Sequence, residues 1–298
     1  MENLQILLRQ HVGKPCAPIV KVGDKVKKGT LIAEPTGLGA NIFSSAYGVV
    51  EEITDEMIVI KPDEEQKDEF VPIEEGTPLE MVRAAGVVGM GGAGFPTEDG
   101  GYILVNASEC EPGLKHNIQQ IEEEPEKVIR GVKLCMEISG ADKAIIAIKK
   151  KNRKAVEILD ECLKDEPNIT RHLLPDIYPM GEERAVVREC LGIELEPSQL
   201  PSAAKSVVIN SETCSRVAEA VDERKPSFLK HLTVRGKLNG GHDAHVFMDV
   251  PVGTSVGALI ERAGGIDGEY GEIVMGGAFT GKSTTLDAPI TKTTGAIL

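Results

Sequence analysis

Hydrophobic and polar positions follow two different periods along this chain. In residues 18–22 apolar residues alternate with polar ones before a Gly23-Asp24 turn, which predicts a short β-strand. Residues 45–53 repeat the same order of turn and apolar pairs.

The two half-repeats resemble the flattened barrel of biotinyl and lipoyl carrier domains. The resemblance implies that residues 1–62 form a barrel-sandwich β domain.

The middle of the chain changes to helical spacing. After the acidic, turn-rich residues 63–77, apolar positions recur every three to four residues in segments separated by short apolar runs. Such alternation predicts a largely parallel sheet with helices on its faces. The expected helices are 77–85, 124–138, 152–164, 182–190 and 215–221, and the expected strands are 102–105, 143–148, 172–174 and 207–209.

The last part of the chain has a third pattern. Strands are expected at 231–238, 245–250 and 272–275, with a helix at 255–263 that ends at two glycines. This order fits a β-grasp shape. The expected fold class is therefore α/β, with a parallel-sheet domain (63–228) flanked by the barrel-sandwich domain (1–62) and a β-grasp domain (229–298).

Composition and charge exclude several function classes. The 298-residue chain has a net charge of −14, no Trp and only 3% aromatic residues, which argues against binding nucleic acid. No apolar run approaches the roughly 20 residues of a membrane-spanning helix, and the N-terminus lacks a signal-peptide layout. We expect a cytoplasmic protein without direct membrane insertion, either free or peripheral to a membrane complex.

The six cysteines are widely separated, and no C-x-x-C motif occurs. The sequence therefore predicts no zinc or iron–sulfur centre held by local spacing, and we expect no metal site. Cys110 lies in a polar segment between predicted elements, so it is the thiol with the best prospect of facing a ligand, although simple packing is the alternative.

A glycine-dense segment is the strongest sign of a ligand. Gly89, Gly91, Gly92 and Gly94 allow close approach of the backbone to a bulky group. The spacing spells G-x-G-x-x-G, but a dinucleotide fingerprint follows a strand and opens a helix. Here a predicted helix precedes the motif and Phe95-Pro96 follows it, so an ordinary Rossmann site is not expected.

Three predicted strands end in polar loops, at residues 106–113, 178–183 and 210–213. In open parallel sheets ligands bind beyond the carboxyl ends of the strands, so we expect these loops and the glycine segment to form one pocket.

Residues 276–283 match G-x-x-x-x-G-K-[ST], but a segment that is rich in β-branched residues and ends in proline follows them. A phosphate-binding loop must run into a helix, so nucleotide hydrolysis is not expected.

These motifs resemble a known superfamily. GGAGFPT at 91–97, NASECEPG at 106–113 and GEE at 181–183 are similar to the flavoprotein subunit of respiratory complex I, and more so to the C subunit of the Rnf electron transport complex. The opening RQHVGKPCAPIVKVGDKV and the final segment extend the match over essentially the whole chain. GANIFSSAYG and TGKSTTLDAPITKTTG resemble the soluble Rnf-like electron-transfer proteins associated with proline reductase in clostridia.

The resemblance implies an electron-transfer flavoprotein that oxidises NADH through bound FMN. It places the glycine segment against the flavin, including Gly89, and assigns the remaining site residues by position. Those expected to bind FMN are Asn106, Glu109, Asn210 and Thr213, and those expected to approach NADH are Phe95, Glu111, Glu182 and Glu183.

Two departures from the family pattern concern the flavin phosphate. Ser108 stands where complex I flavoproteins have aspartate, and Glu98-Asp99 replace a lysine. The cysteine-rich segment of the Rnf C subunit is also missing, so we expect any [4Fe-4S] cluster in a missing C-terminal segment or in a partner. That partner would be an iron–sulfur protein or a selenoprotein reductase. The alternative is a non-catalytic docking or assembly subunit with an empty or degenerate flavin pocket.

Overall fold

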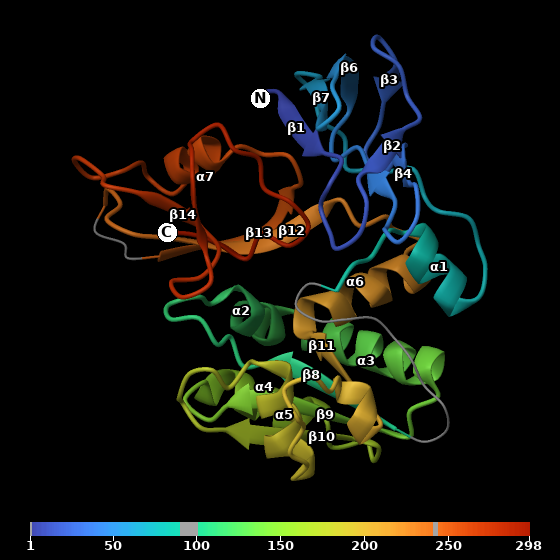
Figure 1. The fold of residues 1–298 in the computed structure, drawn as a ribbon, viewed down its shortest axis with the longest axis vertical. Helices are drawn as coiled ribbons and strands as arrows, with labels where there is room; N and C mark the ends of the chain where they lie inside the picture. Colours follow the sequence, from blue (N-terminus) through green and yellow to red (C-terminus); the bar gives the residue numbers. More distant parts are fainter. Residues whose placement is uncertain (1, 90–100, 241–243) are drawn as a thin grey trace. The chain divides into compact units, whose positions relative to one another are not determined.

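The chain forms two compact units, and the second is inserted into the first. The computed structural model describes residues 2–89, 101–240 and 244–298. Unit 1 comprises Met1–Val88 and Glu219–Leu298, and unit 2 comprises Gly89–Ala218 (Figure 1). Each unit is described by itself below.

Unit 1 begins with the β-barrel predicted from the half-repeats. Two antiparallel sheets, in the orders β1-β7-β6-β3 and β2-β4-β5, enclose a core that includes Ile6, Ile32 and Ile58. The barrel-sandwich prediction is confirmed. Its strands are β1 (Leu4–Leu7), β2 (Cys16–Pro18), β3 (Lys25–Val26), β4 (Leu31–Pro35), β5 (Ile42–Phe43), β6 (Gly48–Ile53) and β7 (Met57–Pro62).

The C-terminal part of unit 1 is a mixed five-stranded sheet with one helix packed on it. The strand order is β13-β12-β16-β14-β15, and β12 and β16 run parallel. Leu232, Leu259 and Ile290 belong to its separate hydrophobic core. The elements are β12 (Leu229–Arg235), β13 (Ala244–Pro251), α7 (Val256–Arg262), β14 (Ile273–Met275), β15 (Lys282–Thr284) and β16 (Ala296–Ile297).

The Walker-like motif lies in a β-hairpin of this sheet. Met275 pairs with Lys282 across the antiparallel strands β14 and β15. Lys282 therefore lies in a strand, and in the described part of the chain no helix follows it. A phosphate-binding loop runs into such a helix, so the described residues after Lys282 lack the context that the motif would need. That the motif takes no part in nucleotide hydrolysis stays a prediction.

The barrel and the C-terminal sheet are joined by hydrogen bonds within unit 1. The amide of Gln5 donates to the carbonyl of Gly253 at 3.1 Å. The Ser45 hydroxyl, which is fully buried, donates to the carbonyl of Val252 at 2.6 Å. Helix α1 (Pro78–Ala84) completes the first segment and begins with a capping box between Thr77 and Glu80.

Unit 2 is built on a four-stranded sheet, β10-β9-β8-β11, in which every neighbouring pair is parallel. The parallel α/β prediction is confirmed. Its strands are β8 (Tyr102–Ala107), β9 (Lys143–Lys149), β10 (Ile169–Leu174) and β11 (Ser206–Asn210). Its helices are α2 (His116–Glu123), α3 (Pro125–Ser139), α4 (Arg153–Cys162), α5 (Glu183–Leu191), the 3₁₀ turn η1 (Pro201–Ala204) and α6 (Ser211–Asp222), which continues into unit 1.

The strand order gives the sheet a topological switch point between β8 and β11, and the edge of the sheet at this point is called the crevice below. From β8 the chain adds β9 and then β10 on one side, and β11 returns to the other side of β8. Right-handed crossovers in opposite directions put their helices on opposite faces of the sheet, and the direction of the crossovers reverses between β8 and β11. Buried Leu104 and Val208 pack in the cluster that contains Val187 of α5.

Several elements differ from the predictions, and two of the differences matter for the site. Helix α2 was not expected, and α6 begins at Ser211, four residues before the predicted start. Across the described ranges 2–89, 101–240 and 244–298, no helix has the length and apolar content needed to cross a membrane. The predicted domain limits at residues 62 and 228 stay a prediction.

Candidate functional site

The crevice between β8 and β11 carries two asparagines. Asn106 and Asn210 are register partners on the last residues that these two parallel strands share. Both therefore lie at the carboxyl edge of the sheet, at the switch point where open α/β sheets bind ligands. Two of the residues predicted to bind the cofactor are thus brought together from distant positions in the sequence.

The amide of Asn106 joins two of the three predicted loops. Its Oδ1 accepts hydrogen bonds from the backbone amide of Ser108 at 3.1 Å and from the Ser108 hydroxyl at 2.7 Å. Its Nδ2 donates to the carbonyl of Gly181 at 2.8 Å. The 106–113 loop and the 178–183 loop are therefore held against each other. Ser108, the departure from the complex I pattern, is buried and orients this amide.

Gly181 is required by this contact. A Cβ atom at this position would lie 2.6 Å from the Ser108 Oγ and 2.7 Å from the Cys110 Cβ. Both distances are shorter than real Cβ contacts, so only glycine allows the two loops to approach so closely. The loops after β8, β10 and β11 thus lie at one edge of the sheet in unit 2. That they form one pocket with the glycine segment stays a prediction.

Glu109 is held inside the protein by the N-terminus of α2. Its carboxylate accepts hydrogen bonds from the amides of Asn117 at 3.1 Å and Ile118 at 3.2 Å, and lies 3.2 Å from the His116 Nδ1. The side chains of Glu109 and His116 are only 3% and 5% exposed. A carboxylate at a helix N-terminus satisfies otherwise unpaired amides and the helix dipole. Glu109 therefore shapes the 106–113 loop from within.

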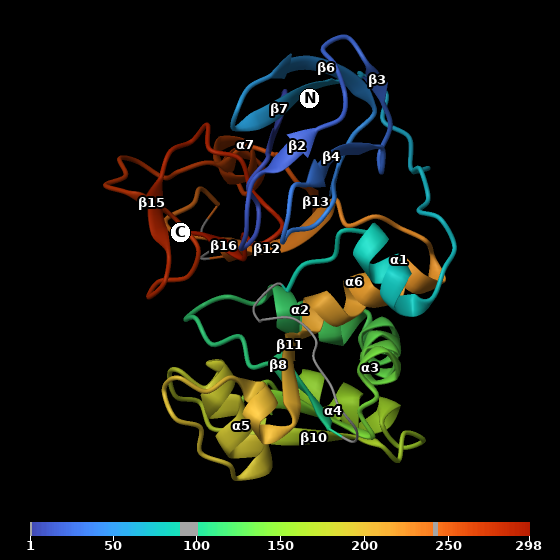
Figure 2. The same cartoon turned by 45° about the vertical axis from the view of Figure 1, so that its right-hand side comes forward.

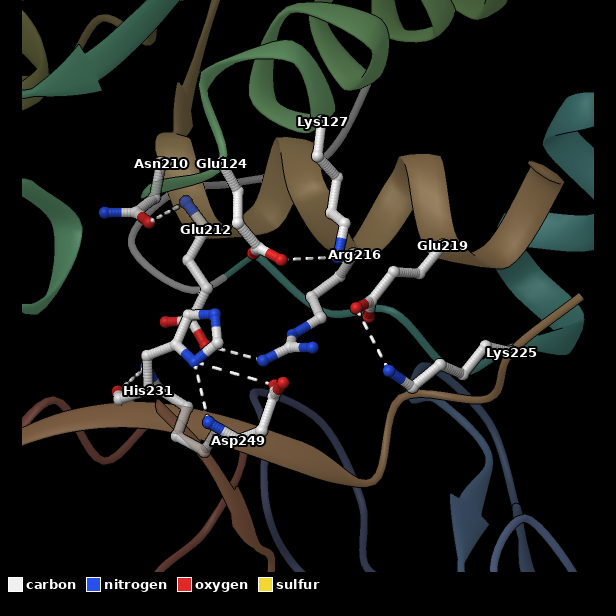
Figure 3. Close-up of polar contacts among 10 residues, drawn as sticks. Glu124, Lys127, Asn210, Glu212, Arg216, Glu219, Lys225, His231 and Asp249 are labelled. Carbon is white, nitrogen blue, oxygen red and sulfur yellow. Dashed lines mark hydrogen bonds and ion pairs between the residues drawn. The ribbon is translucent and has the colours of Figure 1, made fainter. Parts of the chain in front are cut away.

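Helix α6 starts directly at the crevice. The Asn210 Oδ1 accepts a hydrogen bond from the amide of Glu212 at 2.8 Å, which caps the helix and explains its early start (Figure 3). One turn later the Glu212 Oε1 lies 3.5 Å from the Arg216 Nη2, and both side chains are almost fully buried. Thr213, a predicted cofactor residue, is buried in the same first turn.

Two buried hydroxyls on α6 lack hydrogen-bond partners. Ser211 and Ser215 are 0% and 1% exposed, and neither Oγ has a partner among the described residues. They are four residues apart and so lie on one side of the helix. On α2, the Asn117 Oδ1 and both polar atoms of the Gln120 side chain are likewise unsatisfied within the described ranges. Figures 1 and 2 both show α2 beside the first turns of α6.

A cavity of about 790 Å³ opens next to the crevice, beyond the ends of β8, β9 and β10. Cys110 and Tyr178 line it, together with one side of α2. Partial desolvation is the main cause that raises the pKa of the Tyr178 hydroxyl. The nearby charges of Glu111 and Cys110 raise this pKa further. At the far wall, hydrogen bonds from Lys151 and Lys149 lower the pKa of Asp176.

The remaining predicted residues have different surroundings. Glu111 lines the cavity. Glu182 caps α5 by accepting from the amides of Arg184 and Ala185, and its Oε1 also accepts from the Arg184 Nε at 2.9 Å. Glu183 follows as the first residue of α5 and is half-buried, and Gly89 is exposed. Gly91, Gly92, Gly94 and Phe95 lie outside the described residues.

Sequence reasoning missed several members of this site. Ser211 lay within the predicted 210–213 loop but was not named as a binding residue, and Ser215 carried no motif. The burial of both becomes visible only once α6 is placed. Asn117 and Gln120 belong to the unpredicted helix α2. Its N-cap position, Lys115, forms no side-chain cap, because the capping carboxylate comes from Glu109. A local search for capping residues cannot find such a helix start.

Comparison with protein families gives two matches that divide the chain. Residues 82–219 match the family described as the Nuo51 FMN-binding domain. Residues 1–75 match the RnfC barrel sandwich hybrid domain. The first match contains the whole crevice, and the second contains the β-barrel.

Relatives of known name cover different shares of the chain. It is 32% identical to the C subunit of the proton-translocating ferredoxin:NAD(+) oxidoreductase complex of Clostridium ljungdahlii, over 100% of this chain and 70% of that protein. It is 39% identical to the cobalamin reductase PduS of Salmonella typhimurium, over 74% of this chain. The chain spans only 49% of the length of that reductase.

A solved structure supports the fold. A chain of an NAD+-reducing [NiFe]-hydrogenase in the air-oxidized state superposes with a TM-score of 0.61 and 23% sequence identity, covering 74% of this chain and 46% of that chain. At this identity the likeness concerns the fold alone.

Proposed function

Because this chain belongs to the family of Rnf complex C subunits, within the superfamily of the complex I 51-kDa flavoproteins, we propose that it is an electron-transfer module that oxidises NADH through bound FMN. The family relation makes it a relative of flavin-binding electron-transfer subunits and oxidoreductases. FMN as the cofactor, NADH as the electron donor and the kind of electron acceptor are proposed here.

The unsatisfied hydroxyls of Ser211 and Ser215 carry the proposal. A buried hydroxyl without a partner costs about 1–3 kcal/mol, so a native protein keeps two of them at a crevice only where something else satisfies them. FMN has a phosphate and a chain of hydroxyl groups. The donors around the crevice are amides, hydroxyls and the N-terminus of α6, which suit those groups.

The residues at the crevice have separable roles in the proposal. Asn210, Ser211, Thr213 and Ser215 would hold FMN from the β11 side, and Asn106 would hold it from the β8 side while fixing the two loops. FMN supplies hydride acceptance from NADH and release of single electrons. Protein groups orient the reactants and exclude water.

The NADH side of the site would be acidic. Glu111 lines the cavity beside the crevice, and Glu182 and Glu183 open α5 on the loop that Asn106 holds. Carboxylates can accept hydrogen bonds from ribose hydroxyls of NADH. Electrons would leave to an iron–sulfur or selenoprotein acceptor. A proline reductase-type acceptor is proposed only because GANIFSSAYG and TGKSTTLDAPITKTTG resemble segments of proline reductase-associated proteins.

An anaerobic titration tests the proposal. The purified protein is titrated with FMN, followed by flavin fluorescence, and NADH is then added while the visible flavin absorption band is recorded. We expect one FMN per chain and loss of the band on adding NADH, with recovery when a one-electron dye acceptor is supplied. A docking subunit with a degenerate pocket would bind no FMN, or would hold FMN that NADH does not reduce.

A double variant identifies the binding residues. Replacing Ser211 and Ser215 by alanine removes two unsatisfied buried hydroxyls, so the flavin-free protein should become equally or more stable. FMN affinity should fall at the same time. The loss should be about tenfold for each hydrogen bond to FMN that contributes about 1.4 kcal/mol. Ser202→Ala, on an exposed residue of unit 2, is the control and should change neither quantity. A double variant that loses stability and keeps its FMN affinity would contradict the assignment.

A further inference from the structure

A cationic run joins the end of β9 to the first turn of α4 in unit 2. The net charge of the whole chain is −14, so such a run stands out in the sequence. It lies at the carboxyl edge of the parallel sheet, where open α/β sheets bind ligands. The proposed electron transfer does not use it. Its residues are Lys149-Lys150-Lys151-Asn152-Arg153-Lys154.

The burial of Lys149 distinguishes this run from an ordinary solvated surface. The Lys149 side chain is only 4% exposed, and it lines the cavity of about 790 Å³ beside the crevice. Lysine is almost never fully buried unless it is paired. The Lys149 Nζ lies 3.2 Å from the Asp176 Oδ1, and the Lys151 Nζ lies 2.8 Å from the same oxygen. One half-exposed carboxylate thus faces two ammonium groups, which leaves an excess positive charge at the cavity wall.

The neighbouring side chains do not cancel this excess. The Lys154 Nζ is paired with the Glu122 Oε2 at 2.6 Å. Lys150 and Arg153 are exposed, and neither takes part in an ion pair among the described residues. The Asn152 side chain makes no cap at α4, so the helix dipole adds to the positive potential of this edge.

The other acidic groups of the cavity have partners of their own or come from a different loop. The Glu109 carboxylate accepts from two amides of α2, and the Glu123 Oε1 accepts from the Gln119 Nε2 at 2.9 Å. Glu111 belongs to the loop after β8, whereas the lysines follow β9. An anion at the lysines would therefore meet Asp176 as its main competitor.

An apolar wall lies beside this charged one. Ile177 and Tyr178 follow Asp176 directly, line the same cavity, and are 56% and 46% exposed. Such side chains can pack against a flat ring, and the cavity has the volume of a typical small-molecule site, which is about 300–1,000 Å³. Cations that bind phosphate next to a surface that packs a ring are the chemistry that recognises a nucleotide.

We propose that this cavity binds a nucleotide, with its phosphate groups on Lys149 and Lys151 and its base against Ile177 and Tyr178. Lysine binds phosphate oxygens as a point charge through charge-assisted hydrogen bonds. The inference does not rest on FMN, because its residues follow β9 and β10, whereas the proposed flavin residues lie at β8 and β11. The bound phosphates belong either to a separate nucleotide or to the NADH of the proposed function.

Calorimetric titration of the flavin-free protein with ADP tests the proposal, and adenosine serves as the probe without phosphates. We expect one ADP per chain and much weaker binding of adenosine. Lys151→Gln should raise the ADP dissociation constant about tenfold, the change for one lost charge-assisted contact. Lys151 is 55% exposed, so the variant should keep the melting temperature of the wild type. Lys143→Gln is the matched control, because Lys143 is an exposed lysine at the other end of the same strand.

Asp176→Asn provides a second variant with the opposite expected effect. The change removes the carboxylate that competes for both lysines, so ADP should bind severalfold more tightly than to the wild type. If the contacts among Lys149, Lys151 and Asp176 served only to hold the loops together, Lys151→Gln and Asp176→Asn would both weaken binding or both leave it unchanged. Either of those results overturns the proposal.

The remaining outcomes are equally decisive. The proposal is overturned if the wild type binds no ADP, if adenosine binds as tightly as ADP, or if Lys151→Gln and Lys143→Gln bind ADP equally. Competition with NADH identifies the source of the phosphates. Displacement of ADP by NADH assigns the cavity to the dinucleotide, and simultaneous binding assigns it to a separate nucleotide, with the cavity as a nucleotide site in both cases. A protein that binds ADP in this way but no FMN would overturn only the proposed function.

Discussion

Asn106 and Asn210 are paired in register across β8 and β11, yet their side chains act in different directions. The Asn106 amide links the loops after β8 and β10, whereas the Asn210 amide caps α6. One pair of neighbouring residues thus fixes three of the segments that surround the crevice. This arrangement makes the crevice largely pre-formed, which reduces the ordering cost of binding a ligand.

Asn106→Ala should weaken both the fold of unit 2 and its affinity for FMN. The change removes three hydrogen bonds and leaves the Gly181 carbonyl and the Ser108 amide without their partner. We expect a loss of about 1–3 kcal/mol in the free energy of unfolding, measured by denaturant titration, and weaker FMN binding by fluorescence. Asn168→Ala is the control, since Asn168 lies in the same unit and is exposed. Equal behaviour of the two variants would refute the role of Asn106.

Gly181→Ala should separate the loops that Asn106 joins. The new methyl group would meet the Ser108 Oγ at 2.6 Å and the Cys110 Cβ at 2.7 Å, and such overpacking costs about 1–3 kcal/mol. Thermal unfolding should show the loss, and the quantum yield of bound flavin should change with the shape of the site. Gly271→Ala, where nothing lies within 4 Å of the added Cβ, should be neutral. An unaltered melting temperature in Gly181→Ala would show that the loops are not in tight contact.

Glu109→Gln should destabilise α2 and the loop before it. The carboxylate accepts two backbone hydrogen bonds at the N-terminus of α2 and faces His116. A glutamine loses the charge and turns a donor group toward those amides, so we expect a cost of about 1–3 kcal/mol. Hydrogen exchange in residues 116–120 should rise. The exposed Glu123→Gln on the same helix should have no such effect, and protection of α2 that is equal in both variants would contradict the prediction.

Lys292 should make the stability of unit 1 depend on pH. Its side chain is 1% exposed, and burial lowers its pKa from the ordinary value of 10.5 to about 7 in the folded protein. Between about pH 7 and pH 10.5 the Lys292 amine is protonated in the unfolded chain but neutral in the folded protein. The free energy of unfolding therefore rises with pH from about 7 upward. Below that range the full penalty of the buried charge is present.

The size of this pH effect is measurable against Lys292→Met. From about pH 7 to 9 the wild type should gain on the order of 2 kcal/mol relative to the variant. Burial raises the pKa of Cys16, the neighbouring thiol, so Cys16 adds a pH dependence only above its ordinary value of 9.0. Denaturant titrations at several pH values provide the test. Parallel stability curves for the two proteins would show that Lys292 keeps its ordinary pKa.

Periodicity and turn residues were enough to predict the order of most elements. The runs at 143–148 and 124–138 became β9 and α3 with limits shifted by one residue, because their apolar faces and the terminating Gly140 are local signals. The meeting of the loops at 106–113, 178–183 and 210–213 also followed from the sequence. In a parallel sheet the carboxyl ends of neighbouring strands share one edge.

Features that depend on distant contacts were not predictable. Helix α2 owes its start to Glu109, seven residues before its first residue. Lys292, inside a run of threonines, has the pattern of an exposed lysine, and only the fold shows that Asn41 and Gly86 surround it. The grouping of the first and last segments into one compact unit rests on contacts such as Ser45 to Val252. The spacing of residue types along the chain does not indicate which distant residues form such pairs.

The insertion of unit 2 between the two parts of unit 1 has a consequence for biosynthesis. A ribosome releases the barrel first, then all of Gly89–Ala218, and only afterwards the strands to which Ser45 and Gln5 bond. Domains tend to fold as units as they emerge. Unit 2 can therefore reach its native form before the C-terminal part of unit 1 has been synthesised. A nascent chain arrested shortly after α6 should already resist protease across β8–β11 and remain cleavable in the barrel.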